Sequence, residues 1–366
     1  MNASMNPGPG DGGSSTREEY AVRVSLAVAA ILITILGICG NSLVILSVAL
    51  SKKLQTATNI FVTNLAVADF LTCTVVPWNV VALLSNTWPV AEWVCALAAF
   101  TLFLCIGCSV WNLASIAINR LLVITLPAST FQKIFTRRHL VIMVSLTWFI
   151  PALVIGIPVL IGLSELGYDE ENGTCSDKAR GMGGRLYHVA IQAIVLLFIP
   201  MIIIIFCYVK VFIHVRAHTQ QMIRSSLSSV RNTPVLRQKV KTRNKQQVFR
   251  VQTEISKNSF YVVCAFLCCV IPFAVTLAVL QQGQRIASVI LLASACINPF
   301  VYAIKHPHFK KVFMKILYCK WHEIPGRPEF LRSHMSTDRR MSINSTRRWS
   351  NASHIKRPSS SIDDIL

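Results

Sequence analysis

The stretch that decides the fold is VAIQAIVLLFIPMIIIIFCYV, residues 189–209, which contains no charged side chain. A helix that crosses a bilayer needs about 20 mostly apolar residues, because lipid offers no hydrogen-bond partner for exposed backbone N–H and C=O groups. This stretch has that length, so it is predicted to form the centre of a membrane-spanning helix over residues 185–213.

Further apolar runs of similar length lie on either side of this one. They cover residues 22–49, 59–84, 92–124, 139–163, 256–281 and 284–304. The last run is the weakest, because Gln281, Gln282, Gln284 and Arg285 make its start polar. Hydrophobic residues make up 53% of the chain and its mean hydropathy is +0.53, which is too apolar for an ordinary soluble domain. The sequence therefore predicts an all-α membrane protein with a seven-transmembrane helix bundle.

The formal net charge of +20 raises the question of nucleic acid binding, but the position of the charges argues against it. Lys and Arg are concentrated in the connections after the first, third and fifth runs and in the C-terminal tail. Acidic residues mark the N-terminus and the connection after the fourth run. Cytoplasmic loops carry such a basic excess. We therefore expect an extracellular N-terminus, a cytoplasmic C-terminus, contact with membrane lipid and no nucleic acid partner.

Two of the twelve cysteines stand apart from those inside the predicted helices. Cys95 lies at the outer start of the third helix, and Cys175 lies in the outer loop after the fourth. Both face the oxidising side, so we expect a disulfide. Cys319 follows the seventh helix at the cytoplasmic surface, where palmitoylation and a free thiol are both open. Glycosylation sequons on the expected outer face begin at Asn2 and Asn172.

Short motifs in nearly every predicted helix form a characteristic set. They are Gly40-Asn41, residues 64–69 (NLAVAD), Cys95, Asn119-Arg120, Trp148, Pro200 with Tyr208, Pro272 and Asn298-Pro299-Phe300-Val301-Tyr302. On these motifs, roughly residues 22–319 resemble a rhodopsin-like (class A) G protein-coupled receptor. The resemblance implies a plasma-membrane receptor that passes an extracellular signal to a heterotrimeric G protein by opening its cytoplasmic face. It divides the chain into an extracellular tail 1–21, a bundle 22–304, an amphipathic eighth helix 305–318 and a disordered cytoplasmic tail 319–366.

Asp69 is an ionisable side chain in the middle of a predicted span, where a charge is costly and marks a functional or structural site. The resemblance implies a sodium and water pocket formed by Asp69 with Asn41, Ser109, Ser294 and Asn298. The alternative is a structural hydrogen-bond network without an ion. We favour the pocket because all five polar positions fit the family pattern. No other cofactor is expected.

Three prolines inside predicted helices, Pro200, Pro272 and Pro299, each remove a backbone hydrogen bond and can kink a helix. In the family such kinks let helices five to seven move between two states. Three side chains turn inward together when the cytoplasmic end opens. At the matching positions of this chain they are Arg120, Tyr208 and Tyr302.

The chain departs from the family at this switch. The usual Asp-Arg-Tyr reads Asn119-Arg120-Leu121, so Arg120 lacks its neighbouring carboxylate. Gln252 replaces an acidic residue of helix six, although Glu254 lies two residues further on. A neutral Asn119 therefore predicts measurable ligand-independent activity.

Other departures from the family limit which switch mechanism and which classes of ligand fit this chain. Helix six reads CVIP over residues 269–272 without the usual Trp, whose role passes to Phe266 or Phe273 or is lost. Leu102 stands where amine receptors carry an Asp, so no counter-ion for a cationic amine is evident. Leu292 stands where opsins carry the Lys that binds retinal, which disfavours an opsin.

Within the family, local strings are similar to melatonin receptors and to invertebrate receptors of the Moody and Tre type. Residues 200–208 (PMIIIIFCY) and 117–120 (AINR) carry this likeness. Leu196 and Pro158 replace the His and Asn that melatonin receptors direct at their ligand. The likeness of the scaffold therefore does not extend to melatonin as the ligand.

A cavity between the outer halves of the helices is the candidate ligand site. Its expected lining residues are Asn79, Leu102, Phe103, Ile106, His188, Gln192, Phe273, Gln281, Gln282 and Arg285. Mostly apolar walls with a few polar groups suit a small, weakly polar or lipid-like ligand. Arg285 is interpreted as a solvated helix end, with pairing to a ligand carboxylate as the alternative.

The C-terminal tail carries basic motifs that end at Ser342, Ser350 and Ser359, which predicts kinases and arrestin as partners. The sequence shows no metal constellation, nucleophile triad or phosphate loop, so an enzyme is not expected. A constitutively active or ligand-free receptor or scaffold is the alternative function. A transporter is disfavoured because Asp69 is nearly alone among intramembrane charges.

Overall fold

The computed structural model describes residues 12–85, 87–229, 236–276 and 284–324. Several predicted site residues lie outside this part of the chain: Asn2, Gln281, Gln282 and the three tail serines. Most of the expected tail 319–366 lies outside it as well.

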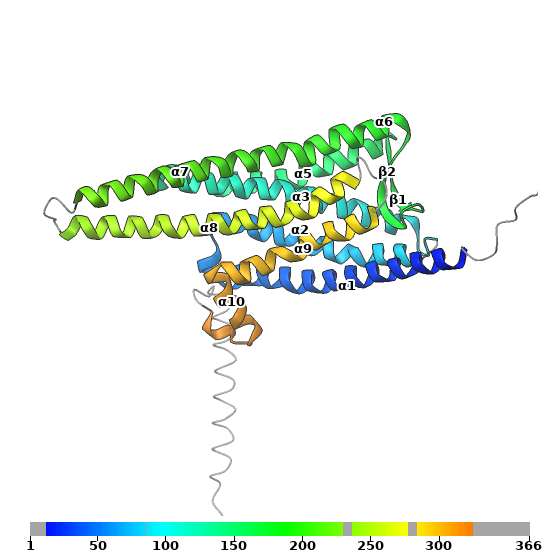
Figure 1. Cartoon of the computed structure of the whole chain (residues 1–366), viewed down its shortest axis with the longest axis horizontal. Coiled ribbons are helices and arrows are strands. Elements are labelled where there is room, and N and C mark those ends of the chain that lie inside the picture. The colour runs from blue at the N-terminus through cyan, green and yellow to red at the C-terminus, as the bar shows by residue number, and fades with distance from the viewer. Residues whose placement is uncertain (1–11, 86, 230–235, 277–283, 325–366) are drawn as a thin grey trace, which may run out of the picture.

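Long helices run side by side and form a single bundle (Figure 1). They are α1 Gly12–Leu50, α2 Ala57–Leu84, α3 Glu92–Thr125, α5 Arg137–Leu160, α7 Ile199–Ser229, α8 Leu236–Val275 and α9 Gln284–Lys305. The short α6 (Gly181–Leu186) and two π-helical segments, Tyr187–Gln192 and Ile194–Phe198, lead into α7. In the described residues, six helices are long and apolar enough to cross a bilayer, and α8 contains the shorter apolar helix Ser259–Phe273. The predicted seven-helix bundle is confirmed.

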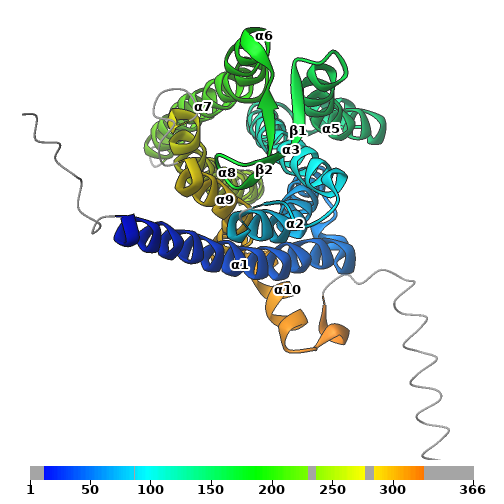
Figure 2. The ribbon, with the colours of Figure 1, turned by 90° about the vertical axis from the view of Figure 1, so that its right-hand side faces the viewer.

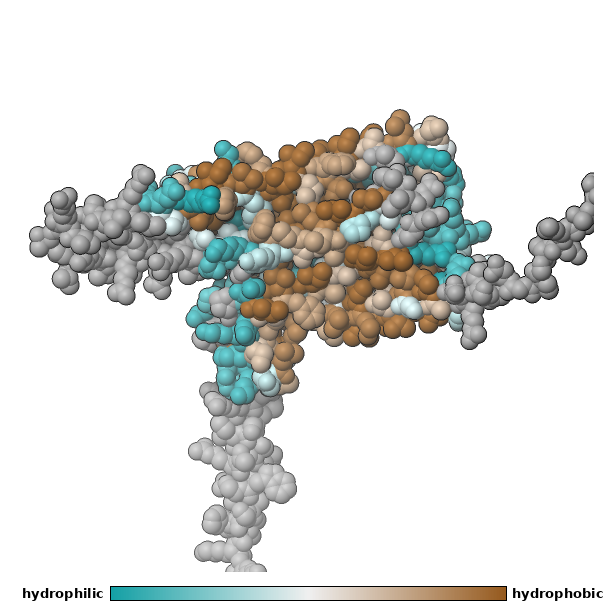
Figure 3. Space-filling model, viewed as in Figure 1, coloured by the Kyte–Doolittle hydropathy of each residue, from teal (hydrophilic) through white to brown (hydrophobic). Residues whose placement is uncertain are grey.

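The outer surface of the bundle is apolar over the middle of its length. Figure 3 shows hydrophobic residues over the centre of one face and hydrophilic residues toward both ends. Large side chains such as Phe149, Ile202 and Phe206 are more than half exposed, at 59%, 65% and 56%. A soluble monomer rarely exposes a contiguous apolar surface of this kind. The chain is therefore a multi-pass membrane protein.

Side-chain caps set where several helices begin. Thr56 precedes α2 and its hydroxyl accepts a hydrogen bond from the backbone N–H of Asn59. Thr136 caps α5 in the same way through the N–H of His139. Each hydroxyl satisfies one of the backbone donors that the first turn of a helix leaves unpaired. The polar loops thus end where the apolar runs start.

The core of the bundle is built from α2, α3 and α8, where Phe61, Leu113 and Val262 are almost fully buried. On the flank, α1 packs against both α2 and α9. The contact with α9 requires glycine at position 40, because a Cβ atom there would lie 2.9 Å from the ring of Pro299. The close approach holds the proline-containing turn of α9 against α1.

A two-stranded hairpin covers one end of the bundle and was not predicted from the sequence. Strands β1 (Ser164–Asp169) and β2 (Thr174–Ala179) are antiparallel, and Gly173 takes a φ of 62° in the turn. Figure 2 looks at this end and shows β1 and β2 lying over the helices. We call it the hairpin end. Both strands are short and mostly polar, so neither produced a strand signal in the sequence.

The other end of the bundle carries α10 (Pro307–Leu317), and we call it the α10 end (Figure 1). This is the expected amphipathic helix. Phe309, Val312 and Phe313 are buried, whereas Lys310 and Lys311 are exposed. A second short helix at this end, α4 (Ala128–Ile134), was not predicted. Helices α7 and α8 extend together beyond the rest of the bundle at this end (Figure 1).

Candidate functional site

Asp69 on α2 is the centre of a buried polar cluster. Its side chain is only 3% exposed. Ser109 of α3 donates a hydrogen bond to Oδ1 of Asp69 at 3.0 Å, and Nδ2 of Asn298 on α9 donates to Oδ2 at 2.7 Å. Three predicted pocket residues from three helices therefore meet directly. Hydrogen-bond donors on both oxygens are what a buried carboxylate needs in order to stay ionised in this environment.

The two other predicted pocket residues lie beside this cluster without contacting Asp69. Ser294 lines a cavity of about 10 Å³ together with Asp69 and Ser109, and its hydroxyl donates to the carbonyl of Leu291. Asn41 on α1 donates to the carbonyl of Ala295 on α9 at 2.9 Å. The cavity has about the volume of one water-sized probe. The carboxylate of Asp69 and the hydroxyl residues Thr72, Ser109 and Ser294 line this space, and oxygen ligands of this kind are those that small hard cations prefer.

A second polar network, which the sequence reasoning missed, ties α2 to α3 and α5. Nδ2 of Asn64 lies 3.2 Å from Oδ1 of Asn112 and 3.0 Å from Oγ1 of Thr147. Trp148 donates its indole N–H to Asn64, and Asn112 donates to the carbonyl of Phe61. Asn64 and Trp148 were noted only as motif residues. Their roles here are structural, since each polar group satisfies another inside the bundle.

Arg120 lies buried near the α10 end of α3. Its Nε donates to Oγ of Ser259 on α8 at 3.3 Å, which ties α3 to α8. No carboxylate of the described residues lies within ion-pair distance of it, and Glu254 pairs with Lys257 instead. Asn119 accepts a hydrogen bond of 2.6 Å from Thr58 of α2, while its buried Nδ2 has no partner among the described atoms.

The remaining switch residues surround Arg120 from other helices. The ring of Tyr208 on α7 packs edge-on against Phe260, and the ring of Tyr302 on α9 stacks on Phe309 of α10. Pro272 and Pro299 lie inside α8 and α9, as expected from the motifs. Arg120, Tyr208 and Tyr302 thus lie toward the α10 end, whereas Pro272 lies near the hairpin end of α8. The rings of the two tyrosines contact other aromatic rings rather than one another.

A cavity of about 930 Å³ opens beside Arg120 at the α10 end. Its basic and imidazole lining residues are Lys53, Arg120, His214, His218, His306 and His308. The described lining includes no acidic side chain. Burial, with a smaller effect of Arg120, lowers the pKa of His306 to about 4. His306 is therefore neutral near pH 7, which suits the acceptance of a hydrogen bond by its Nδ1 from the N–H of Phe309.

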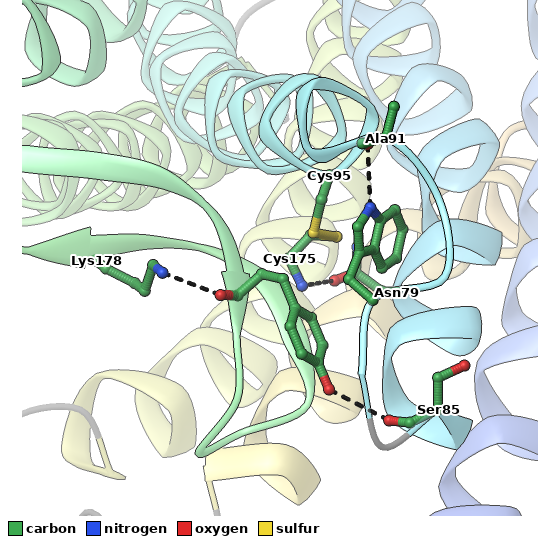
Figure 4. Close-up of a disulfide and its surroundings, with 8 residues drawn as sticks. Asn79, Ser85, Ala91, Cys95, Cys175 and Lys178 are labelled. Carbon is green, nitrogen blue, oxygen red and sulfur yellow. Dashed lines mark hydrogen bonds between the residues drawn. A yellow bond between two sulfur atoms is a disulfide. The ribbon is translucent and has the colours of Figure 1, made fainter.

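At the hairpin end, a disulfide joins Cys95 of α3 to Cys175 of β2, as predicted. Figure 4 shows the bond and its surroundings. The backbone N–H of Cys175 donates to Oδ1 of Asn79 on α2 at 3.1 Å. Tyr168 of β1 donates its hydroxyl hydrogen to the carbonyl of Ser85, and its ring stacks on Trp88. The hairpin is therefore fixed to both α2 and α3.

A cavity of about 80 Å³ lies between the outer ends of α1, α2, α3, α8 and α9, beneath β2. Six of the ten predicted ligand-site residues line it: Asn79, Leu102, Phe103, Ile106, Phe273 and Arg285. Its other walls are mostly apolar and include Leu292. The cavity is thus small and mostly apolar, with polar residues such as Asn79, Thr174 and Arg285 in its wall.

His188 and Gln192 do not line this cavity. They face Asp177 of β2 instead, with Nε2 of Gln192 at 3.3 Å and Nε2 of His188 at 3.5 Å from Oδ2 of Asp177. The Asp177 side chain is 2% exposed. This contact joins the hairpin to the π-helical start of the fifth span, and Asp177 had been assigned only to an acidic loop. At the base of the hairpin, Arg180 pairs with Glu165 and lowers the pKa of that carboxyl group.

Comparison with known proteins agrees with this architecture. The model of the 7 transmembrane receptor (rhodopsin family) matches residues 40–302, which is more than half of the chain. The chain belongs to this family. The receptor is 26% identical to the melatonin receptor type 1B-B of Danio rerio over 340 residues, which cover 89% of this chain and 90% of that protein.

Two further relatives show how broad the likeness is. The receptor is 25% identical to the G-protein coupled receptor moody of Drosophila melanogaster over 350 residues, covering 80% of this chain and 51% of moody. The chain thus spans about half the length of that relative. The crystal structure of squid rhodopsin matches with a TM-score of 0.70 at 25% identity, covering 82% of this chain and 87% of that one.

The likeness to squid rhodopsin does not extend to a retinal attachment site. Leu292, at the position where opsins carry the retinal lysine, lines the receptor's apolar cavity and is 8% exposed. The described residues around this cavity include no lysine. A Schiff base requires a lysine amine.

Arg285 is not the solvated helix end that the sequence suggested. Its Nε donates to the carbonyl of Asn172 at 3.0 Å and its Nη2 to the carbonyl of Glu171 at 2.8 Å. Its Nη1 lies 3.1 Å from Oε1 of Glu19 on α1. One guanidinium therefore joins α9, the hairpin turn and α1, because its planar fork presents donors in several directions. No sequence pattern indicated that these segments meet.

We expect Arg285→Ala to loosen the hairpin turn. Hydrogen bonds to charged groups contribute roughly 1.5–3 kcal/mol, so amide exchange across the turn 169–174 should accelerate by about tenfold or more. Hydrogen–deuterium exchange of the purified receptor measures this directly. Arg185→Ala removes an exposed arginine of α6 and serves as the control. Unchanged exchange in Arg285→Ala would show that the disulfide and the contacts of Tyr168 and Asn79 hold the hairpin without Arg285.

Proposed function

We propose that the receptor binds a small, weakly polar or lipid-like extracellular ligand beneath the hairpin and signals to a heterotrimeric G protein at the α10 end. Helix α3 supports this proposal, because it lines both cavities. On α3, Leu102, Phe103 and Ile106 line the apolar cavity, and Arg120 lines the large basic opening at the opposite end. Family membership supports signalling through G proteins. A shift of the helices around α3 would couple the two cavities.

We place the hairpin end outside the cell and the receptor in the plasma membrane. The Cys95–Cys175 disulfide supports this orientation, because such bonds persist in oxidising compartments. The basic connections at the α10 end support it as well. Asn172 in the hairpin turn would then face the glycosylation machinery. A glycan replaces one of the two hydrogens on its Nδ2, and the other hydrogen remains for the bond that it donates to Asp169.

A cell-based screen tests the proposal. G-protein activation is measured for each G-protein class, first without ligand and then with a library of lipids and metabolites, at matched surface expression. Arg120→Ala, which removes the basic group of the α10-end opening, should abolish any response. Failure of every G-protein class to respond under all conditions would contradict the proposal.

Ligand-independent signalling is the second candidate function. The observation that favours it is the absence of a carboxylate near Arg120 among the described residues, which removes the contact that restrains the resting state in the family. A high signal in the ligand-free arm of the screen supports this candidate. Melatonin is not proposed as the ligand, because Leu196 and Pro158 stand at the positions of the expected polar contacts.

We also propose a sodium site at Asp69. Asp69→Asn removes the buried carboxylate while keeping the shape of the side chain, so the cation loses its counter-charge. Replacing sodium chloride by choline chloride should change wild-type signalling severalfold and leave Asp69→Asn unaffected. A wild type that shows no sodium dependence would establish the structural network as the whole role of these residues.

The C-terminal region is proposed to regulate the receptor. Cys319 is exposed and lies just after α10, so it is a candidate for palmitoylation or a free thiol. Its φ is 54°. Ser342, Ser350 and Ser359 follow basic residues, and phosphate added there would provide charge for arrestin binding. Mass spectrometry of receptor from stimulated cells tests both modifications.

A further inference from the structure

The side chain of Asn79 has one fixed orientation at the top of the apolar cavity. Its oxygen lies 3.1 Å from the backbone nitrogen of Cys175 (Figure 4). A backbone N–H can only donate, so the amide oxygen rather than the amide nitrogen must face it. The hydrogen bond to the disulfide-anchored strand thus decides which way the amide of Asn79 points.

This orientation leaves the amide nitrogen of Asn79 without an acceptor. Nδ2 is buried and has no hydrogen-bond partner among the described atoms, although Asn79 lines the cavity. A buried donor left unpaired costs roughly 1–3 kcal/mol. The other polar residues that line the cavity make no hydrogen bond with Nδ2 among the described atoms: Thr174, Ser176, Gln284, Ser288 and Arg285. Within the described part of the chain no group fills this role, which leaves it to a molecule that enters the cavity.

The rest of the cavity limits what that molecule can be. Apolar side chains form most of the wall: Val76, Val80, Leu102, Phe103, Val289 and Leu292. Its volume of about 80 Å³ is smaller than the ~150 Å³ cavity that accommodates benzene. The part of the ligand that is buried here is therefore slender, about the size of a short chain or of the acetyl end of a larger molecule. A charged group at Asn79 would be buried among apolar residues at a high desolvation cost.

Resting on the proposed function, we propose that this cavity recognises a neutral apolar ligand through one oxygen acceptor, a carbonyl or ether, that takes the hydrogen bond of Asn79 Nδ2. The same amide holds the N–H of Cys175, so the ligand contacts the anchored hairpin through a single side chain. Arg285 does not serve as the anchor, since its donors hold Glu19 and the hairpin turn.

Two probes of nearly equal shape test this inference on the full-length receptor in lipid nanodiscs. Acetophenone carries a carbonyl, whereas α-methylstyrene has a C=CH₂ group in its place. Thermal stabilisation is titrated with each probe. We expect acetophenone to act at a concentration at least about tenfold lower, because a site built for a hydrogen bond discriminates against an analogue that lacks it.

Asn79→Asp distinguishes a role of Asn79 in binding the ligand from its role in holding the hairpin. The introduced carboxyl keeps an oxygen for the N–H of Cys175 and has no donor once it is ionised, so at pH 9 the preference for acetophenone should disappear while the hairpin stays in place. At neutral pH, burial favours the protonated carboxyl, whose O–H can still donate. Gln192→Ala, a polar change outside the cavity, should retain the preference. Equal responses to the two probes, no response to either, or a preference that survives Asn79→Asp at pH 9 would overturn the inference.

The wild-type probe comparison remains decisive even if Asn79→Asp fails to fold. Thermal stabilisation also needs no G protein. Selective binding without signalling would therefore count against the proposed function alone, and signalling without selective binding would count against this inference alone.

Discussion

Cys95→Ser is expected to lower the melting temperature of the purified receptor by about 5–10 °C and to reduce its surface expression severalfold. The disulfide closes a loop with a sequence separation of 80 residues, for which the chain-entropy model gives about 4.5 kcal/mol. The membrane already holds α3 and α5 together, so a smaller value of about 2–3 kcal/mol should remain. That amount corresponds to a shift of several degrees for a chain of this size.

Two controls sharpen this measurement. Cys175→Ser and the double variant should match Cys95→Ser, because the three variants remove the same bond. Cys268→Ser replaces an exposed free cysteine and should behave like wild type. A Cys95→Ser receptor with wild-type stability would show that the contacts of Tyr168 and Asn79 suffice to fix the hairpin.

Asn119→Asp is expected to lower ligand-independent G-protein activation at least threefold at matched surface expression. Asp keeps the oxygen that accepts from Thr58 and replaces the unpartnered Nδ2 of Asn119 with a negative charge beside Arg120. At an effective dielectric of about 20 and a separation of roughly 4 Å, such a pair gains up to ~4 kcal/mol before desolvation. Even a fraction of this energy shifts a two-state balance severalfold toward the resting state.

Thr58→Val provides the control for this variant, because it removes the hydrogen bond to Asn119 without adding charge. Asn119→Asp should lower basal signalling, whereas Thr58→Val should not. Equal or higher output from Asn119→Asp would show that other contacts, such as Arg120 with Ser259, hold the resting state.

The helices of the bundle could be predicted from the sequence because each one is determined by its own apolar run. Each apolar run must satisfy its own backbone in lipid, and helices do this without partners from elsewhere in the chain. The run 284–304 and α9 (Gln284–Lys305) agree almost residue for residue. The hairpin depends instead on the pairing of β1 with β2 and on the disulfide. Each strand has only six residues of mixed polarity, so it shows no long apolar run or regular alternation that would predict it from the sequence.

The candidate sites divide in the same way. Asp69, Ser109 and Asn298 were placed together by motif, and they do meet. Contacts between helices and loops could not be predicted from the sequence. The sequence does not show that Arg285 binds the turn, nor that a backbone N–H orients the amide of Asn79. Such contacts depend on the folded positions of residues far apart in the chain.

The position of β2 over the apolar cavity affects how fast a ligand can bind and dissociate. The hairpin is held by a covalent bond to α3 and by the guanidinium of Arg285, so a molecule that passes beneath β2 must wait for a local opening of the hairpin. Association would then be slower than diffusion allows, and residence would be long even at modest affinity. Such a receptor would keep reporting an agonist after the surrounding medium had been cleared of it, and it would average over brief pulses instead of following them.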